Sequence, residues 1–378
     1  MGIVKEVVII GGGLAGLTAA LHLQQLDFQV TLIEKSAYPH HRVCGEYVSN
    51  EVLPYLHELG ISFLELGPSQ LTELQVTAVN GKSIRARLPL GGFGLSRYAM
   101  DNFLYQELIS RKVNVLQDTV TDVGYQNGIF KVSTSSGQTF DSVYVLGAFG
   151  KRSTLDGKLG RGFLGKKSDF IAVKAHYLGR VEDQLVGLHN FDGGYCGISK
   201  VEGGMINVCY LADYKSFGKY KKIQDFQIGV LYKNLHIREV LDNSTMLFKA
   251  PMSIGQVCFS AKPPVYGHML MVGDTAGLIH PLCGNGMAMA IHSAKIASEL
   301  IADHASGKIG SSAQLEGNYA KMWKHHFGSR IAAGRMLSAV MGNHLAQGIV
   351  INTMAKIPNL LDRVISLTHG KPITIDRR

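Results

Sequence analysis

The fold of this chain can be inferred from one stretch near its start, Val7-Val-Ile-Ile10-Gly11-Gly-Gly13-Leu-Ala-Gly16. Its four apolar residues are typical of a buried parallel strand that ends in glycines. Leu14 to Gln25 is rich in alanine and leucine and predicts a helix, and Gln29 to Ile33 predicts a second strand. The order strand, helix, strand indicates a βαβ unit at the start of the chain.

The glycines at positions 11, 13 and 16 have the spacing of a dinucleotide-binding turn. Gly11 permits a tight turn, Gly13 leaves room for a pyrophosphate, and Gly16 lets helix and strand pack closely. The helix that starts at Leu14-Ala15 would direct free N–H groups at the phosphates. Glu34 ends the second strand and is placed to accept hydrogen bonds from an adenosine ribose. The first part of the chain therefore predicts a Rossmann-like site.

A second match to the same glycine pattern runs from Gly160 to Gly165. No apolar strand precedes it, and the residues after it, Lys166 to Asp169, do not open an apolar helix. We therefore expect a loop there, and a single dinucleotide fold in the chain.

A further signal is the run Met269 to Ala276, in which a predicted strand ends at Gly273-Asp274. A carboxylate at that sheet edge could accept a hydrogen bond from a polyol hydroxyl, because ligands of doubly wound folds bind there. Gly284 and Gly286 would let backbone N–H groups and the helix that begins at Met287 approach an electron-rich ring. Capping of a helix is the alternative role for Asp274.

The rest of the chain indicates two domains interleaved in sequence, as 378 residues at about 150 per domain would allow. Short β-rich runs fill residues 61–95 and 168–259, including a hairpin over 195–210, and the pattern is mainly helical from Ala313 onward. We assign 1–60, 96–155 and 260–305 to a discontinuous cofactor domain, 61–95 and 156–259 to a substrate domain, and 306–378 to a helical C-terminal region. The expected fold class is α/β with an α+β insert: a Rossmann-like domain interleaved with a β-sheet substrate domain, followed by a helical tail.

Composition excludes several classes of protein. Hydrophobic residues make up 46% of the chain and charged residues 18%, which excludes a disordered protein. The net charge of +9 is scattered, so we expect no nucleic-acid partner. Five cysteines without a C-x-x-C pair predict neither a disulfide framework nor a metal site, and they favour a reducing, cytoplasmic compartment.

Two windows without Asp, Glu, Lys or Arg, residues 275–294 and 336–355, are nominally long enough to span a membrane. Both contain polar residues that are unsuited to a lipid-facing helix. The second has apolar residues at i+4 spacing and predicts an amphipathic helix, which leaves a weak peripheral membrane contact open as an alternative.

Taken together, the glycine motif with Glu34 and the Gly273-Asp274 motif with Pro281, Gly284 and Gly286 resemble the FAD-binding motifs of glutathione-reductase-type flavoproteins. Within these, the chain is similar to the geranylgeranyl-reductase-like branch and to the single-component aromatic hydroxylases. The resemblance implies FAD as the cofactor, NAD(P)H as a transient reductant and a small hydrophobic substrate.

Three further segments carry the resemblance. Cys44-Gly45-Glu46 is similar to a segment of the reductase-like branch, Ser96-Arg97 to the arginine that these families place near the FAD phosphates, and Gly147 to Ser153 to their Gly-Ala-Asp-Gly-x-x-Ser segment. The cofactor-binding residues that the motifs imply are Gly11, Gly13, Leu14, Ala15, Gly16, Glu34, Lys35, Arg42, Cys44, Arg97, Val120, Gly150, Asp274, Pro281, Gly284, Gly286 and Met287.

Four residues are candidates for catalysis. Cys44 could tune the flavin or be a small buried hydrophobe, and Glu46 could be a general acid with a pKa raised by burial or a surface carboxylate. Tyr195 could line the substrate pocket or be an ordinary strand residue, and His280 could relay a proton or be a hydrogen-bonded core histidine.

The sequence also departs from both branches. Phe149 replaces the acid of the hydroxylase segment, and Gly277 stands where hydroxylases carry histidine, which favours the reductase-like branch. Tyr195-Cys-Gly-Ile-Ser199 keeps only the tyrosine of that branch's Tyr-x-Trp-x-Phe-Pro motif. The only tryptophan, Trp323, lies in the helical tail, which argues against tryptophan-type halogenases.

The function expected from these observations is that of an FAD-dependent oxidoreductase. An NAD(P)H-dependent monooxygenase that acts on a small hydrophobic, aromatic or polyketide-like molecule is the first hypothesis. A reductase of carbon–carbon double bonds is the second. A non-catalytic flavoprotein or a peripheral membrane module is the third.

Overall fold

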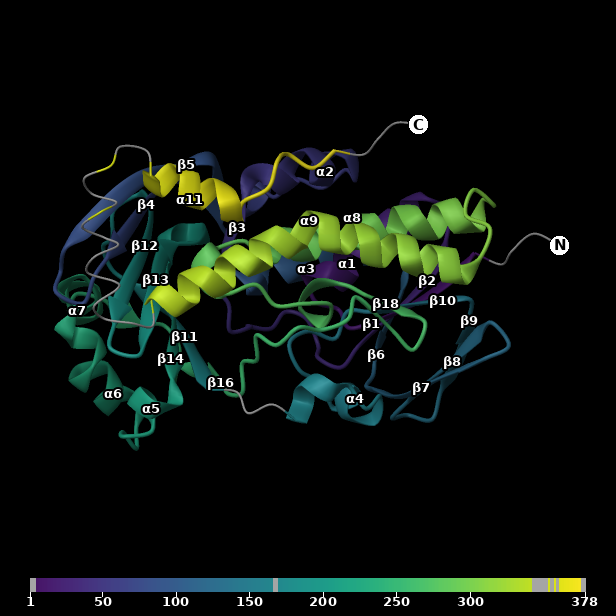
Figure 1. The fold of residues 1–378 in the computed structure, drawn as a ribbon, viewed down its shortest axis with the longest axis horizontal. Helices are drawn as coiled ribbons and strands as arrows, with labels where there is room; N and C mark the ends of the chain where they lie inside the picture. The colour runs from purple at the N-terminus through teal and green to yellow at the C-terminus, as the bar shows by residue number, and fades with distance from the viewer. Residues whose placement is uncertain (1–4, 166–168, 342–352, 354–356, 358–359, 375–378) are drawn as a thin grey trace.

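The structure, a computed structural model, describes residues 5–165, 169–341, 353, 357 and 360–374. Two large sheets lie at opposite ends of the molecule, and the long helix α9 (Ser312–Met341) runs from one towards the other (Figure 1). A small sheet of three strands lies beside the first, formed by β7 (Val120–Gln126), β8 (Ile129–Thr134) and β9 (Thr139–Ser142).

The first large sheet contains the predicted βαβ unit. Its strands are β1 (Glu6–Ile10), β2 (Gln29–Glu34), β6 (Asn114–Gln117), β10 (Tyr144–Gly147), β17 (Val265–Tyr266) and β18 (Met269–Met271). The strand order is β17-β18-β10-β1-β2-β6, and every pair is parallel except β17 with β18. β1 lies between two parallel strands, and its residues Val7 to Ile10 are buried on both faces of the sheet, as the continuous apolar run predicts.

The two faces of β1 pack against different layers. Val7 and Ile9 belong to a core with α1 (Leu14–Gln25), α3 (Arg97–Ser110) and α8 (Gly286–Ala305). Val8 and Ile10 pack instead against Phe130 and Val132 of β8. Strands alternate their side chains between faces, so one run of apolar residues joins a helical layer to the small sheet.

The second large sheet has nine strands: β3 (Tyr47–Ser49), β4 (Ser69–Thr77), β5 (Ser83–Gly94), β11 (Phe170–Leu178), β12 (Gln184–Phe191), β13 (Gly194–Lys200), β14 (Ile206–Asp213), β15 (Thr245–Met246) and β16 (Met252–Ile254). The predicted hairpin over 195–210 is the antiparallel pair β13–β14. One face packs against α6 (Ile223–Gly229) and α7 (Leu235–Asp242) through Phe226 and Ile237. The other face turns towards the first sheet.

The C-terminal helices cover the join between the two halves. α9 packs on α8, and α11 (Leu360–Thr368) lies over β5 (Figure 1). Trp323 of α9 lies so close to Gly277 that a Cβ there would be 2.8 Å from its ring. The glycine at 277, which the sequence singled out, therefore makes room for a helix that comes later in the chain.

The remaining helices are short: α2 (Leu53–Glu58), α4 (Thr154–Lys158), α5 (Tyr214–Phe217) and the 3-10 turns at 50–52, 64–66, 162–165, 202–204, 231–233, 273–275 and 281–283. The second glycine pattern, Gly160 to Gly165, ends in such a turn, with a short helix and not a strand before it. It lies outside the first sheet, as its flanking residues predict.

The predicted fold class is confirmed: the α/β cofactor sheet, the β-rich insert and the helical tail are all present. The domain boundaries stay a prediction, and β3, from the segment assigned to the cofactor domain, pairs with β5 in the second sheet. Most of the predicted amphipathic helix over 336–355 lies outside the described residues. No helix among the described residues is long and apolar enough to cross a membrane.

Candidate functional site

A cavity of about 670 Å³ opens between the two large sheets. It begins at the carboxyl ends of β1 and β2 and continues to the inner face of the nine-stranded sheet. The sequence predicts a ligand at the carboxyl ends of the parallel strands, and the cavity lies there.

The glycine loop forms one wall of this cavity. Gly11 has a φ of +105°, and a Cβ there would be 2.5 Å from the carbonyl oxygen of Ala148. Gly13 is the N-cap of α1 and provides no side-chain cap, so the first N–H groups of the helix are left for a ligand. A Cβ on Gly13 would be 3.6 Å from the guanidinium of Arg97 across the cavity.

Glu34 is buried beside this loop. Its Oε2 accepts a hydrogen bond from Gly12 N–H at 2.6 Å, and its Oε1 accepts one from Ser36 N–H at 3.0 Å. Arg42 lies 3.4 Å from Oε2. The carboxylate therefore fixes the glycine loop as well as lining the cavity, and its contact with a ribose stays a prediction.

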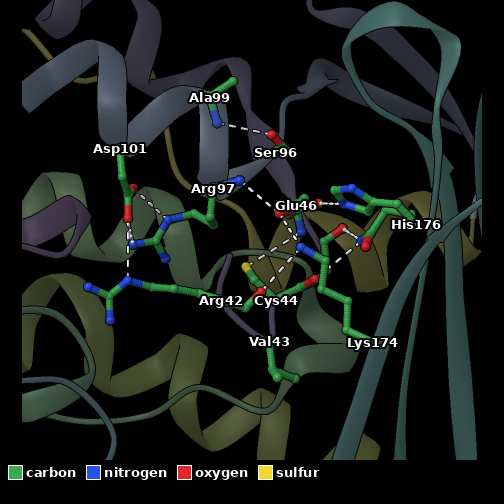
Figure 2. Close-up of polar contacts among 12 residues, drawn as sticks. Arg42, Val43, Cys44, Glu46, Ser96, Arg97, Ala99, Asp101, Lys174 and His176 are labelled. Carbon is green, nitrogen blue, oxygen red and sulfur yellow. Dashed lines mark hydrogen bonds and ion pairs between the residues drawn. The ribbon is translucent and has the colours of Figure 1, made fainter. Parts of the chain in front are cut away.

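Two arginines, Arg97 and Arg42, meet the carboxylate of Asp101 (Figure 2), and Arg97 lies next to the glycine loop. Arg97 donates two hydrogen bonds to Asp101, from Nε at 2.7 Å and from a terminal nitrogen at 2.6 Å. Arg42 Nε lies 3.4 Å from the same carboxylate. Burial would lower the pKa of Arg97, but the charge of Asp101 and its hydrogen bonds raise it above the usual value. Arg97 thus keeps its charge where anionic phosphates would bind.

The Gly273-Asp274 motif lies beside the glycine loop, since a Cβ on Gly273 would be 3.0 Å from the Cβ of Ala15. Asp274 lines the cavity within a 3-10 turn whose N-cap, Val272, forms no side-chain cap. Its carboxylate accepts no hydrogen bond from any described residue that would make it a helix cap. Lys262 instead donates to the backbone oxygen of Asp274 at 2.9 Å, and burial lowers the pKa of Lys262 to about 8.

The start of α8 completes this wall. Asn285, its N-cap, makes no capping hydrogen bond with its side chain, so the N–H groups of Gly286 and Met287 begin a helix without a cap. Gly284 before it has a φ of +63°, which a residue with a side chain rarely adopts. Two uncapped helix starts, α1 and α8, therefore meet one cavity.

These features fit FAD. The uncapped start of α1 with Arg97 suits two phosphates, Glu34 and Asp274 are acceptors for ribose and ribityl hydroxyls, and the uncapped start of α8 suits the electron-rich end of a flavin. Of the residues that the sequence assigned to the cofactor, all line the cavity except Gly16. A Cβ on Gly16 would lie 2.0 Å from the carbonyl oxygen of Gly11, so Gly16 serves the packing of helix on strand and not the ligand.

The four catalytic candidates separate in the structure. Cys44, Glu46 and Tyr195 line the cavity, whereas His280 does not. His280 caps the turn that begins at Pro281 by accepting from Leu282 N–H at 3.4 Å, and burial lowers its pKa to about 4. It is the hydrogen-bonded core histidine that the sequence left as an alternative.

The pKa expected for Glu46 is wrong. Burial alone would raise it, but the hydrogen bond from His176 and the ammonium of Lys174 together lower it below the usual value. Glu46 is fully buried and ionised, so it is neither a surface carboxylate nor a protonated general acid.

Sequence reasoning missed Lys174, His176 and Asn207, which hold the segment around Glu46. Lys174 and His176 stand two apart in an otherwise apolar strand, and that spacing places them on one face. It also missed the C-terminal lining of the cavity, namely Leu361 and Ile365 of α11 and His369 just after that helix.

The half of the cavity next to the nine-stranded sheet is apolar. Its wall is formed by aliphatic side chains from β4, β5, β12 and α11: Leu74, Val76, Ile84, Leu88, Val186, Leu188, Leu361 and Ile365. Tyr195 adds an aromatic ring, and burial raises the pKa of its hydroxyl well above the usual value. Most charged side chains of the described lining belong to segments beside the first sheet. Glu46 and the titratable His369 are the exceptions.

The fold and this cavity define the class of protein: a flavoprotein with a dinucleotide-type cofactor site. Residues 5–316 match the family described as FAD binding domain, and the chain belongs to that family. It is an FAD-dependent oxidoreductase.

Relatives of different activity resemble the chain. Digeranylgeranylglycerophospholipid reductase 2 of Methanothermobacter thermautotrophicus is 23% identical over 343 residues, which are 86% of this chain and 85% of that protein. The FAD-dependent monooxygenase ntnA of a Nectria species is 23% identical over 353 residues, covering 80% of this chain and 45% of that protein.

The fold is also that of a solved halogenating enzyme. The flavin-dependent brominase Bmp2 superposes with a TM-score of 0.77 at 18% identity, over 96% of this chain and 92% of that one. At this identity, the likeness extends to the fold alone.

Proposed function

We propose that the protein is an NAD(P)H-dependent monooxygenase whose substrate is a small hydrophobic molecule, aromatic or polyketide-like. Bound FAD would supply the chemistry, accepting a hydride and then activating oxygen. The observation that carries the proposal is the state of Glu46. Among the described residues, Glu46 is the carboxylate located between the cofactor half and the apolar half of the cavity. Lys174 and His176 keep it ionised.

An ionised Glu46 cannot give a proton to a carbon atom of a substrate. Saturation of a double bond needs such a proton after hydride transfer, whereas oxygen transfer to an aromatic ring does not need a carboxylic acid on the protein. The residues of the chain then have three tasks. The glycine loop and the start of α8 hold the cofactor, the aliphatic wall excludes water, and Tyr195 contacts the substrate.

The reductase stays a second candidate because of Tyr195. Burial raises the pKa of this hydroxyl well above its usual value, so it stays protonated, and it lines the apolar half of the cavity. A protonated hydroxyl beside the substrate could complete a saturation. The reductase among the relatives agrees with this alternative.

Oxygen dependence separates the two. We expect the purified protein with NADPH or NADH and an aromatic or polyketide-like compound to yield a hydroxylated product in air and none under anaerobic conditions. Product is measured by mass spectrometry, with one added oxygen atom or two added hydrogens as the alternatives. A saturated product formed without oxygen would overturn the monooxygenase.

Tyr195→Phe provides the matched variant, because it removes only the hydroxyl from a residue that is 7% exposed. In a monooxygenase we expect turnover within about threefold of the parent. In a reductase that uses this hydroxyl, the loss would be tenfold or more, which corresponds to about 1.4 kcal/mol.

We also propose that the protein is located in the cytoplasm. All five cysteines are free thiols, which suits a reducing, cytoplasmic compartment.

A further inference from the structure

The segment from Arg42 to Glu46, here called the 42–46 segment, is tied to the far sheet through its backbone. Asn207 of β14 donates its side-chain amide to the carbonyl oxygens of Cys44 at 3.2 Å and Gly45 at 2.8 Å. Lys174 of β11 donates to the carbonyl oxygen of Arg42 at 3.2 Å. A segment that follows the cofactor sheet is thus positioned by side chains of the nine-stranded sheet.

Glu46 is the centre of these contacts (Figure 2). Its Oε1 accepts hydrogen bonds from Arg97 N–H at 2.7 Å and from the ammonium of Lys174, and its Oε2 accepts from His176 Nε2 at 2.7 Å. The side chains of Glu46, Lys174 and His176 are at most 2% exposed. A buried charge needs this pairing, because an unpaired one would be costly to desolvate.

The backbone of Glu46 is also unusual, with a φ of +55° in the left-handed region. A non-glycine residue keeps this conformation only where the surrounding contacts hold it there. Here the contacts come from three elements, namely β11, β14 and the start of α3. Cys44 and Gly45, which directly precede this residue, line the cavity.

The sulfur atom of Cys44 has two contacts. The N–H of Glu46 lies 3.5 Å from Cys44 Sγ, and Cys44 Sγ lies 3.5 Å from Met287 Sδ. Met287 is the second residue of α8, the uncapped helix start that suits the flavin end of the cofactor. The thiol of Cys44 therefore contacts both the backbone of Glu46 and the start of α8.

The sequence of β11 explains how two polar residues reach this place. Ile171, Val173, Ala175 and Tyr177 point to the core with α6 and α7, so Lys174 and His176 share the opposite face. The register places Lys174 opposite Cys209 and His176 opposite Asn207, which brings Asn207 beside the same segment. Polar residues on one face of two neighbouring strands thus meet one loop.

We propose that Lys174 and His176 are positioning residues: through Glu46 they hold the left-handed turn that presents Cys44 to the flavin end of the cavity. The inference goes beyond the proposed function and depends only on the cavity and its FAD, not on whether the reaction is oxygenation or reduction. An ion pair that merely fastens two halves of the molecule would contribute to stability and leave Cys44 in place.

The test is the reactivity of Cys44 in the full-length protein after removal of flavin. Lys174→Met and His176→Leu each remove one side-chain partner of Glu46. Iodoacetamide labelling is then followed at each cysteine by peptide mass spectrometry. We expect the rate at Cys44 to change at least tenfold in both variants. Cys258, which is also half-buried but lies outside the cavity lining, provides the reference within the same molecule and should change less than twofold.

Matched controls separate positioning from stability. Lys295→Met removes another buried lysine that is bonded to a glutamate, Glu299 at 2.7 Å on α8, and His189→Leu removes another buried histidine of the same sheet. Both should lower the melting temperature without changing the rate at Cys44. His176→Gln keeps a donor for Glu46 and should restore the parental rate within about twofold.

A second readout uses the flavin-loaded protein. The absorption bands of bound flavin should change shape in Lys174→Met and His176→Leu and stay parental in the controls. Parental Cys44 labelling and parental flavin bands in variants that melt earlier would overturn the inference and leave a purely structural ion pair. If Lys174→Met does not fold, the comparison of His176→Leu with His176→Gln decides the same question.

Discussion

Two regions of the cavity wall satisfy their polar groups in opposite ways. At the glycine loop, α1 begins without a side-chain cap, and a Cβ on Gly13 would have only the Arg97 guanidinium, 3.6 Å away, within contact range. At the 42–46 segment, the carboxylate of Glu46 accepts hydrogen bonds from Arg97, Lys174 and His176. The N–H groups at the glycine loop are left without a side-chain partner, whereas the Glu46 carboxylate has protein partners without a ligand.

This contrast separates buried polar groups that bind a ligand from those that shape the site. Unsatisfied donors at a helix start have a cost that a ligand can remove, so they indicate where a ligand binds. The Glu46 carboxylate has no exposed surface and accepts from three donors of the protein, so it fixes the shape of the site. We therefore propose that the glycine loop binds the cofactor and that Glu46 positions the 42–46 segment.

The largest effect that tests this difference is expected at Gly13. Gly13→Glu should abolish FAD binding, because its carboxylate would occupy the place of the pyrophosphate and repel it. Flavin content per folded chain, measured from the absorption spectrum, checks this. Gly124→Glu is the matched control, since Gly124 is exposed on β7 and a Cβ there meets no heavy atom within 4 Å. Normal flavin content in folded Gly13→Glu would show that the phosphates lie elsewhere.

Asp274 tests the same wall with a smaller effect. Asp274→Ala should weaken FAD retention by about 1.5–3 kcal/mol, the range for a hydrogen bond that involves a charged group, or between about tenfold and a hundredfold in the dissociation constant. Fluorescence titration of the flavin-free protein measures it. An unchanged dissociation constant would mean that the carboxylate contacts no part of the cofactor.

The smallest expected effect concerns the charge state of two buried groups, Glu46 and His189. Glu46 keeps its charge through partners, whereas His189 stays neutral because burial lowers its pKa to about 3 from 6.5. The unfolded chain then binds a proton at this histidine below pH 6.5 and the folded chain does not, so stability is lost as the pH falls from 6.5 towards 3. At pH 5 this one group costs about 2 kcal/mol.

His189→Gln should reduce the loss of stability between pH 7 and pH 5 by that amount, as measured by urea unfolding. The exposed His57→Gln should leave the loss as it is. Glu46→Gln acts in a lower window, because a carboxylate with a lowered pKa loses its contribution only as the pH falls below 4.5. Equal losses of stability in the parent and His189→Gln would show that this histidine is protonated in the folded state.

Local patterns predicted much of the cofactor half. The apolar run before Gly11, the helix from Leu14 and the strand that ends at Glu34 are found where their periodicity places them. Parallel strands of one sheet end at the same edge, so Asp274 could be assigned to the cavity from its place after a strand. Gly16 packs helix against strand, as the motif predicts, although it was also counted among the cofactor-binding residues and does not line the cavity.

The substrate half could not be predicted in the same way. Its wall combines β4, β5 and β12 with α11, and the order of strands in the nine-stranded sheet decides which side chains meet. The sequence offers both His280 and Tyr195 as candidates, and the structure places only Tyr195 in the cavity lining.

By itself the sequence determined the βαβ unit, the FAD motifs and the positions of the glycines, because these depend on residues that are close along the chain. Tertiary structure alone decided the charge of Glu46, since its pKa is lowered by Lys174 and His176 from a strand more than a hundred residues away. Electrostatic interactions act through space and are strongest where water is excluded. The protonation state of a buried group therefore follows from its neighbours in the fold and not from its neighbours in the sequence.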